Sequence, residues 1–264
     1  MKNILISTGG SGGHVVPATI FYEHLKDKHN VFLTSDKRGI QFLDKNKYNI
    51  KIINVPKISK NFFLLPFKIF ALLILIFKSF FFCKREKIEI LISTGGYMSL
   101  PLCIASKLLN IKLFLFEPNI VLGRTNKFFV NYSAKVFCYS ENIKNFPDKL
   151  KSKIFLISPL LRKSFYSTKL TERINNEINL LIIGGSQSAK LFDTAIRQTV
   201  ILLSKKYKIK VFHQTSLSNF NDMKNFYLKY KIESEIFDFN EDVSNFMSKS
   251  NICITRAGAS TLAE

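Results

Sequence analysis

The chain has 264 residues, enough for one large domain or two of ordinary size. Apolar residues make up 47% of it, which excludes wholesale disorder. The formal net charge of +20 favours an anionic partner, such as nucleic acid, a membrane surface or a phosphorylated ligand. The chain is also rich in Lys, Asn, Ile and Phe, as AT-rich coding DNA would give, so part of the positive charge reflects that bias.

Short apolar runs, glycine turns and helical patterns follow one another along the chain. The run "NILIS" meets the loop "TGGSGGH", and residues 15–28 then carry apolar residues at helical spacing. The order recurs in "IEILISTGGYMSLPLCIASKLL", in "NLLIIGGSQSAKLFDTAIRQTVILLSKK" and at the start of "NICITRAGASTLAE". Further strands are expected at residues 112–116, 134–139 and 209–212.

Strands that alternate with helices predict parallel sheets with helices on both faces. Two glycine units lie in each half of the chain, and the segment around Ser158 and Pro159 separates the halves. The predicted fold is therefore α/β, with two Rossmann-like, doubly wound parallel-sheet domains at residues 1–157 and 158–264 that face a cleft. Ligands of such sheets bind at the carboxyl ends of the strands, where the glycines lie.

The glycine loops indicate phosphate-rich ligands. A loop that enters a helix points free N–H groups outward, the helix dipole adds positive charge, and glycine lets a bulky anion approach the backbone. The common nucleotide motifs fit badly, because no Lys-Ser or Lys-Thr follows the glycines and Val15 stands where GxGxxG needs its third glycine. Any one of these loops alone is as often an ordinary turn.

The residues around the glycines resemble the MurG family of bacterial glycosyltransferases. "TGGSGGHVVPA" is similar to the family's GGTGGHxxPA, "STGGYMSLP" to GxGGYxSxP and "FEPNIVLGRTNKF" to HEQNxxxGxTNK. "SPLLR", "GGSQSAKLFD", "FHQTS" and "CITRAGASTLAE" resemble the family's later motifs in the same order. Phe116, Pro118, Ser188 and Ser216 depart from the family pattern.

The resemblance implies the GT-B architecture and an inverting transfer without a catalytic metal or other cofactor. N-acetylglucosamine would move from UDP-GlcNAc to the C4 hydroxyl of undecaprenyl-pyrophosphoryl-MurNAc-pentapeptide (lipid I), which gives lipid II in peptidoglycan synthesis. The first domain would bind the lipid-linked acceptor and the second the UDP-sugar. Family members continue beyond the position of Glu264, so the sequence is expected to be truncated, with an incomplete second domain and poor donor binding.

The resemblance also implies roles for particular residues. Histidine titrates near neutral pH, which suits a general base, so His14 is the candidate catalytic residue; a phosphate contact and a helix-cap role stay open. The expected acceptor-diphosphate residues are Gly95, Gly96 and Tyr97, which would act together with the loop "TGGSGGH". The expected donor-binding residues are Ser11, Gly12, Gly13, Asn119, Arg162, Ser186 and Glu264. His213 and Gln214 are assigned no catalytic part.

The most apolar stretch, residues 61–87, suggests contact with a membrane. A spanning helix needs about 20 mostly apolar residues, but Lys68, Lys78 and Pro66 interrupt this one, and a span would cut the first domain in two. We expect an in-plane amphipathic helix on an anionic membrane surface, from Phe62 to Cys83, that holds the protein peripherally on the cytoplasmic face of the inner membrane. The alternative is a buried core helix.

The cysteines and the amino terminus indicate a cytosolic protein. Cys83, Cys103, Cys138 and Cys253 form no CxxC pair and lie in or beside apolar runs, so we expect reduced core thiols and no zinc site. The apolar run at residues 4–6 is too short for a signal peptide.

Two other functions compete with the transferase. The chain would serve as a non-catalytic half-transferase, a membrane-bound partner subunit, if a separate chain supplied the remaining segment. The net charge alone favours a nucleic-acid binder, but the lysines are scattered and no known binding motif appears, so we expect no nucleic-acid partner.

Overall fold

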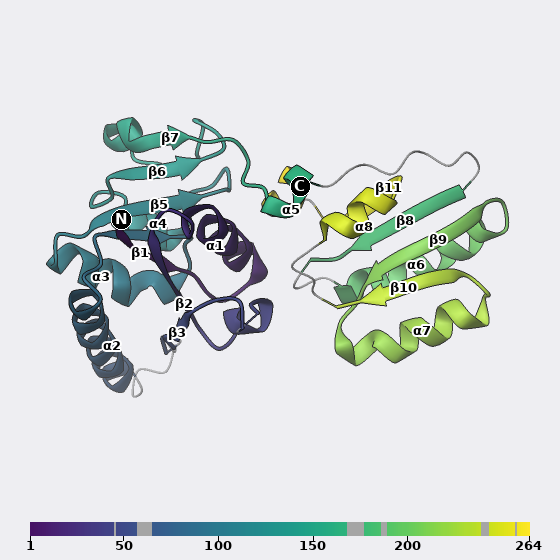
Figure 1. Ribbon diagram of the computed structural model, residues 1–264, viewed down its shortest axis with the longest axis horizontal. Helices are drawn as coiled ribbons and strands as arrows, with labels where there is room; N and C mark the ends of the chain where they lie inside the picture. Colours follow the sequence, from purple (N-terminus) through teal and green to yellow (C-terminus); the bar gives the residue numbers. More distant parts are fainter. Residues whose placement is uncertain (45, 57–64, 168–176, 186–188, 239–242, 257) are drawn as a thin grey trace. The chain divides into compact units, whose positions relative to one another are not determined.

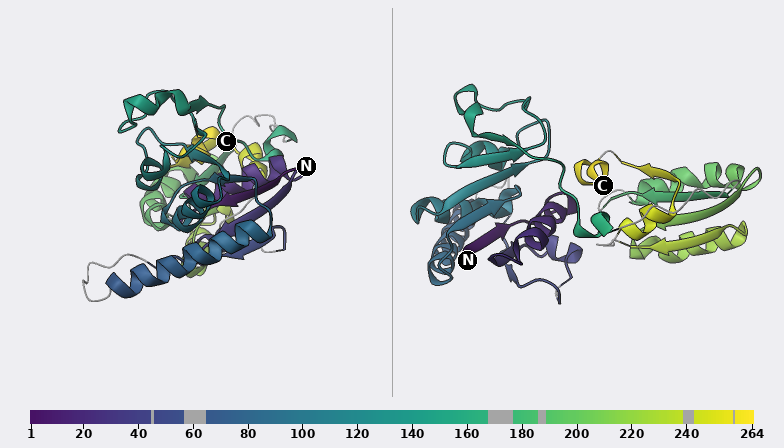
Figure 2. Two further views of the ribbon diagram at one scale, coloured as in Figure 1. Left: turned by 90° about the vertical axis from the view of Figure 1, so that its left-hand side faces the viewer. Right: turned by 45° about the horizontal axis from the view of Figure 1, so that its top comes forward.

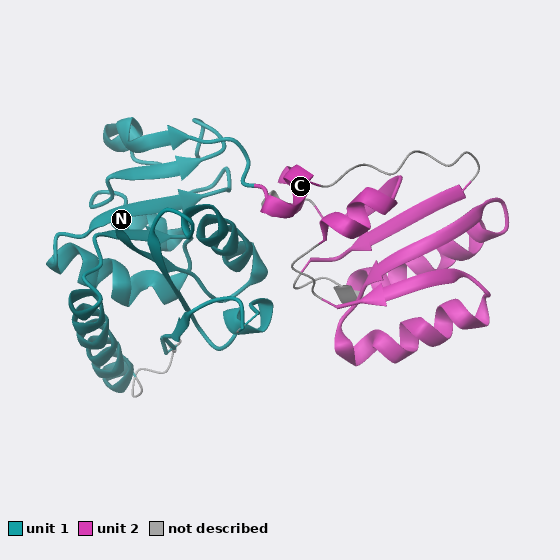
Figure 3. Ribbon diagram, in the orientation of Figure 1, with its two compact units in different colours: residues 1–160 teal, residues 161–264 magenta. Residues whose placement is uncertain are grey.

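The computed structural model describes residues 1–44, 46–56, 65–167, 177–185, 189–238, 243–256 and 258–264. The chain divides into two compact units, Met1–Leu160 and Leu161–Glu264 (Figure 3). The sequence-based boundary after residue 157 lies in the segment that joins the last strand of the first unit to the first helix of the second.

The described residues of unit 1 form a 7-stranded parallel sheet in the order β3-β2-β1-β4-β5-β6-β7 (Figure 1). The strands are β1 (Asn3–Ser7), β2 (Asn30–Ser35), β3 (Ile50–Ile52), β4 (Ile90–Ser93), β5 (Lys112–Glu117), β6 (Lys135–Cys138) and β7 (Ile154–Leu156). The helices are α1 (Gly12–Leu25), α2 (Leu65–Arg85), α3 (Leu100–Leu108) and α4 (Arg124–Phe129), with short 3-10 helices η1 (Gly39–Phe42), η3 (Tyr97–Ser99) and η4 (Asp148–Lys153).

The strand order of unit 1 reverses between β1 and β4, and this fixes where a ligand can bind. β1 begins the chain, β2 and β3 extend the sheet on one side, and β4 to β7 extend it on the other. Ser7 pairs in register with Ser93, so the two glycine loops leave the sheet at the same edge. A parallel sheet opens a crevice at such a switch point, at the carboxyl ends of its strands.

The described residues of unit 2 repeat this order in a 4-stranded parallel sheet, β10-β9-β8-β11. The strands are β8 (Glu177–Ile183), β9 (Lys208–Gln214), β10 (Glu233–Phe237) and β11 (Ile252–Thr255). The helices are α5 (Lys163–Ser167), α6 (Ala189–Ser204), α7 (Phe220–Lys229), α8 (Ser244–Lys249) and α9 (Ala259–Ala263), with the 3-10 helix η5 (Leu217–Asn219). The predicted pair of doubly wound parallel sheets is confirmed.

Alternation along β8 explains how unit 2 packs both faces of its sheet. Leu180 and Ile182 belong to a core that includes residues of α6 and α7, whereas Leu181 and Ile183 join a second core with Phe246 of α8. Successive side chains of a strand point to opposite faces. A stretch of strand covered on both faces must be apolar, as Leu180 to Ile183 are, whereas the polar Glu177 and Asn179 lie in the partly exposed first half of β8.

α2 packs one end against unit 1 and leaves most of its length exposed (Figures 1 and 2). Its buried residues are Ser79, Phe82 and Cys83. Large exposed apolar side chains recur at helical spacing on the rest of the helix: Phe67, Phe70, Ile74, Phe77 and Phe81. The core-helix alternative is therefore wrong for most of α2, while residues 62–64 of the expected membrane segment lie outside the described residues.

The cysteines are free thiols, as expected, but they do not all lie in the core. Cys83, Cys103 and Cys138 are buried, and burial raises the pKa of the Cys103 and Cys138 thiols to about 12. The prediction is wrong for Cys253, which is exposed. Its strand, β11, ends the strand order in the described part of the small sheet, so apolar sequence there does not imply a covered face.

Candidate functional site

The ring of His14 is held in one tautomer by the second glycine loop, which we define as residues 94–97. His14 lies in the first turn of α1, just after the first glycine loop, residues 8–13. Its Nδ1 lies 2.7 Å from the carbonyl oxygen of Thr94, which can only accept a hydrogen bond, so Nδ1 carries the proton. In the neutral ring, Nε2 then keeps its lone pair and can take up a proton.

The ring of His14 also lies against the backbone of the second loop. A Cβ on Gly95 would come 3.2 Å from Cε1 of the ring, and one on Gly96 would come 3.6 Å from Cδ2. Both glycines have positive φ angles, 94° and 80°, which side-chain-bearing residues rarely adopt. Glycine at these positions therefore lets the imidazole pack directly on the loop.

The start of α1 offers unpaired N–H donors. Ser11 is the N-cap, and its carbonyl oxygen accepts hydrogen bonds from the backbone N–H groups of His14 and Val15. Within the described residues, the N–H groups of Gly12 and Gly13 have no partner. The first turn of a helix provides such free donors together with the positive end of the dipole, which suits an anion.

Asp36, which the sequence analysis missed, organises the first glycine loop. It follows the carboxyl end of β2 and is buried. Its Oδ1 accepts hydrogen bonds from the backbone N–H of Gly10, at 2.7 Å, and of Gly39, at 2.8 Å. Its Oδ2 pairs with Nε of Arg38 at 3.2 Å. One carboxylate thus fastens the loop after β1 to the segment after β2.

Arg38 connects this segment to the second glycine loop. Its Nη2 donates a hydrogen bond of 2.8 Å to the hydroxyl of Tyr97, and its guanidinium carbon lies 5.6 Å from the centre of the Tyr97 ring. A Cβ on Gly10 would lie 3.7 Å from the same Nη2. The guanidinium group therefore lies beside both glycine loops, at the edge where β1 and β4 end.

Glu117 is a buried hub: its carboxylate accepts several hydrogen bonds from the segment that carries Asn119. Its Oε2 accepts hydrogen bonds from the backbone N–H of Gly123, at 2.7 Å, and from Nδ2 of Asn126, at 3.0 Å. Its Oε1 accepts a bond of 2.9 Å from Nδ2 of Asn119, which leaves the amide oxygen of Asn119 available. Because Nδ2 of Asn126 would lie 3.7 Å from a Cβ on Gly95, this hub lies next to the second loop.

In unit 2 the turn after β8, at Gly184 and Gly185, corresponds to the third glycine unit of the sequence. Gly185 has a φ of 67°, and its N–H donates a 3.1 Å hydrogen bond to Oε1 of Gln214. Ser186, the expected donor-binding residue of this turn, lies outside the described residues. Gln214 therefore has a positioning contact that the sequence analysis did not assign.

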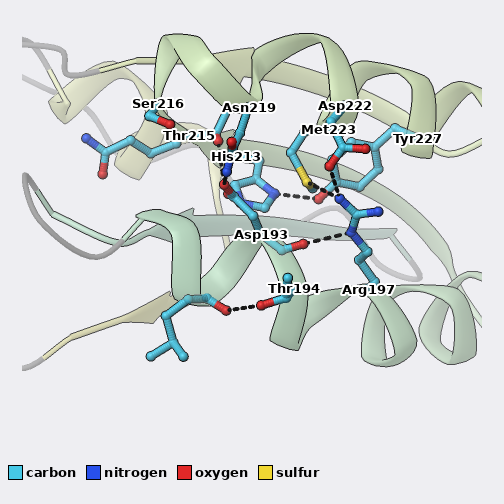
Figure 4. A network of polar contacts seen from close by, with 12 residues as sticks. Asp193, Thr194, Arg197, His213, Thr215, Ser216, Asn219, Asp222, Met223 and Tyr227 are labelled. Carbon is cyan, nitrogen blue, oxygen red and sulfur yellow. Dashed lines mark hydrogen bonds and ion pairs between the residues drawn. The ribbon is translucent and has the colours of Figure 1, made fainter.

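A buried polar network lies behind this turn, between α6, β9 and α7 (Figure 4). Oδ2 of Asp193 accepts hydrogen bonds from Oγ1 of Thr215, at 2.8 Å, and from Nδ2 of Asn219, at 2.6 Å. Nε2 of His213 lies 3.3 Å from Oδ1 of Asp193, and Nδ1 of His213 lies 2.7 Å from the hydroxyl of Tyr227. Burial lowers the pKa of His213 to about 4, so the ring is neutral.

Arg162 and Glu264, two expected donor-binding residues, pair with each other. Nε of Arg162 lies 3.1 Å from Oε1 of Glu264, and both side chains are largely buried. Burial raises the pKa of Glu264, and the Arg162 charge opposes that shift. Nη1 of Arg162 is buried without a hydrogen-bond partner in the described part of the chain. The pair joins the start of unit 2 to the residue after α9.

The expected site residues thus form separate groups within the two units. In unit 1 the structure gathers Ser11, Gly12, Gly13 and His14 with Gly95, Gly96 and Tyr97 at the edge where β1 and β4 end. Asp36, Arg38 and Asp193 were missed. Their signal in the sequence was weak, because a charged residue after a short strand or in a helix becomes informative only when its contacts are known.

Models of two domain families match the chain. The N-terminal domain of glycosyltransferase family 28 matches residues 4–138, and its C-terminal domain matches residues 179–264. Among curated relatives, a protein of Pelagibacter ubique is 57% identical over 263 residues, which cover all of this chain and 74% of that protein. It is named UDP-N-acetylglucosamine–N-acetylmuramyl-(pentapeptide) pyrophosphoryl-undecaprenol N-acetylglucosamine transferase.

Solved structures agree with these matches. MurG of Acinetobacter baumannii has 25% sequence identity and a TM-score of 0.69, with 99% of this chain and 75% of that chain covered. A UDP-GlcNAc 2-epimerase of Neisseria meningitidis, bound to UDP-GlcNAc, shares the fold with a TM-score of 0.61 at 16% identity, over 97% of this chain and 78% of that one. The chain therefore belongs to glycosyltransferase family 28 and, within it, to the MurG group of N-acetylglucosamine transferases.

Proposed function

We propose that the chain catalyses transfer of N-acetylglucosamine from UDP-GlcNAc to the C4 hydroxyl of lipid I, with inversion at the anomeric carbon, to give lipid II. The observation that carries this proposal is the 57% identity, along the whole chain, to a protein named as that transferase. The arrangement of unit 1 supports it, because a histidine with a free ring nitrogen lies beside two glycine loops.

In the proposed reaction, the acceptor hydroxyl attacks the anomeric carbon and its proton passes to Nε2 of His14. The Thr94 carbonyl keeps the proton of Nδ1 in place, so Nε2 is the free base in the neutral ring. The bond from the anomeric carbon to the UDP oxygen breaks as the new glycosidic bond forms. The leaving diphosphate takes up the electron pair, so no covalent intermediate is needed.

Backbone donors bind the acceptor's diphosphate in this proposal. Gly12 and Gly13, which the family motif assigned to the donor, are assigned here to this diphosphate, because within the described residues their N–H groups are unpaired at the start of α1. The second loop contributes Gly96 and the hydroxyl of Tyr97, whereas the N–H of Gly95 already donates to Oγ of Ser93 at 3.2 Å. Donors at a helix start are already oriented and need no rearrangement when the charge arrives.

On the donor side, we assign the UDP diphosphate to the turn at Gly184 and Gly185 with Ser186 and Arg162. We assign Glu264 to the ribose hydroxyls on its match to the family motif; its side chain is 3% exposed and paired with Arg162, so ribose binding requires the carboxylate to become accessible. Asn119 contacts the sugar through its amide oxygen, since its Nδ2 is bound to Glu117.

A direct assay tests the proposal: UDP-GlcNAc labelled in its sugar is incubated with lipid I or a short-chain analogue. Formation of a β-linked disaccharide product and UDP in equal amounts is the expected result. No transfer by the folded protein, with lipid I still bound, would instead support the non-catalytic half-transferase.

We also propose that α2 lies in the cytoplasmic surface of the inner membrane and holds the protein there peripherally. Among the described helices, α2 alone has the length and composition of a membrane span. It carries no acidic residue, Phe67 and Phe70 are 74% and 65% exposed, and Lys78 is exposed further along the same helix. A crossing would extract Ser79, Phe82 and Cys83 from the unit and pull on β4, which an in-plane helix does not.

Vesicle sedimentation tests this membrane contact. The variant Phe70→Ser/Phe77→Ser should bind vesicles containing anionic lipid at least about tenfold more weakly, because each phenylalanine loses a burial free energy of about 1.5–3 kcal/mol. The control, Phe128→Ser/Phe155→Ser, changes two exposed rings outside α2 and should bind as the parent does. Equal binding to neutral and anionic vesicles would reject the electrostatic part of the proposal.

A further inference from the structure

We infer that Arg38 binds the diphosphate of the lipid-linked acceptor, as a residue of unit 1 that no sequence motif had marked. This inference rests on the proposed function, since it names one more group of the same site. Three observations carry it: the position of the guanidinium beside both glycine loops, its fixed orientation, and its unused N–H donors.

The position of Arg38 is set by groups on both sides of the guanidinium. Oδ2 of Asp36 accepts from Nε at 3.2 Å, and the hydroxyl of Tyr97 accepts from Nη2 at 2.8 Å. Asp36 is itself buried and held by two backbone N–H groups, so it forms a rigid base for the arginine. The side chain loses little further conformational entropy when a ligand binds, because its orientation is already set.

Arg38 keeps donors for a ligand. In the described structure its contacts use Nε and one N–H of Nη2, so both N–H groups of Nη1 and the second N–H of Nη2 are free. The side chain is 46% exposed, whereas that of its partner Asp36 is 6% exposed. The exposed part of the pair is therefore the guanidinium group of Arg38, whose planar N–H donors match the oxygens of a phosphate.

The negative charge of Asp36 does not prevent Arg38 from binding a phosphate. Its Oδ1 is occupied by the N–H groups of Gly10 and Gly39, and its Oδ2 by Arg38, so little of its charge faces outward. Arg38 therefore contributes directed hydrogen bonds rather than a large net charge. Tyr97 adds to them, because a phenol that accepts from Arg38 still has its own proton to donate.

The test compares Arg38→Gln and Arg38→Lys with the control Lys37→Gln in the transfer assay. Lys37 is an exposed cation that precedes Arg38 in the sequence, so its substitution removes the same charge but leaves the guanidinium group in place. Arg38→Gln should raise the KM for lipid I about ten- to hundredfold, since a charge-assisted hydrogen bond is lost, and leave the KM for UDP-GlcNAc unchanged. Arg38→Lys should recover only part of the loss, and Lys37→Gln should match the parent.

Two further measurements distinguish a failure of the inference about Arg38 from a failure of the proposed function. Binding of inorganic pyrophosphate, followed by calorimetry, needs no catalysis and should also weaken in Arg38→Gln. Vesicle binding should stay as in the parent, which distinguishes the acceptor diphosphate from lipid headgroups. An unchanged KM for lipid I, or an equal rise of both KM values with a lower Tm, overturns the inference. Absence of transfer by the parent protein, with pyrophosphate binding still dependent on Arg38, overturns the proposed function alone.

Discussion

The two units hold their glycine turns in different ways. In unit 1 the groups that fix the loops lie at the loops themselves: Asp36 fastens Gly10, Arg38 reaches Tyr97, and His14 packs on Gly95. Arg38 is substantially exposed and His14 partly so. The same side chains can therefore shape the loops and meet a ligand.

In unit 2 the fixing groups are set back from the turn. Oε1 of Gln214 accepts the hydrogen bond of the Gly185 N–H. Thr215, the residue after β9, donates to the buried Asp193 (Figure 4). His213 and Asp193 are 0% and 2% exposed, so neither presents a surface to a ligand. This polar network joins α6 to β9 and α7.

Two similar glycine motifs therefore rely on different residues: in unit 1 the residues that hold the loops can also bind a ligand, whereas in unit 2 they only support the fold. Substitutions at the loops of unit 1 should change the reaction more than the free energy of unfolding. Substitutions in the Asp193 network should do the reverse, because a buried hydrogen-bonded carboxylate stabilises its surroundings and leaves donors unpaired when removed.

The largest expected effect is on catalysis, from His14→Gln. Glutamine keeps a polar side chain but cannot accept the proton, so kcat should fall by roughly 10²–10⁴-fold with little change in Tm. The matched control is His24→Gln, an exposed histidine of the same helix, and kcat should be unchanged there. A raised KM for lipid I with kcat retained would instead assign His14 to a phosphate contact.

The next largest effect is on stability, from Asp193→Ala. Its loss leaves Thr215 and Asn219 without their acceptor, and the free energy of unfolding should fall by about 2–4 kcal/mol. The control Asp222→Ala removes a carboxylate that pairs with Arg197 but is largely exposed, which is worth about 0–1 kcal/mol. Urea denaturation measures both, and equal losses would break the distinction between buried support and surface pairing.

A third effect, at about 1.4 kcal/mol per pH unit, is a pH dependence of stability from His213. Its folded-state pKa of about 4 lies below the ordinary value of 6.5, so the unfolded chain takes up the proton first. This contribution to stability is complete above pH 6.5 and is lost as the pH falls to about 4, with a limiting slope of about 1.4 kcal/mol per pH unit.

Urea unfolding between pH 7.5 and 4.5 checks this slope. His213→Asn does not titrate in this range, and its side-chain oxygen can accept from Tyr227 in place of Nδ1. The parent protein should lose stability faster than this variant as the pH falls. Parallel curves would show that His213 does not favour the neutral form in the folded state.

Local periodicity and motifs of consecutive residues were enough to predict the parallel sheets, the glycine turns, the family and most of the strands, although not β2, β3, β7 and β10. The contacts that hold the turns became visible only in the folded structure. Asp36 and Gly10, Arg38 and Tyr97, and Asp193 and Thr215 lie far apart in sequence and meet through strand order and register. The tertiary structure also decided that α2 is exposed, since an apolar run reads the same whether its side chains meet a core or leave it.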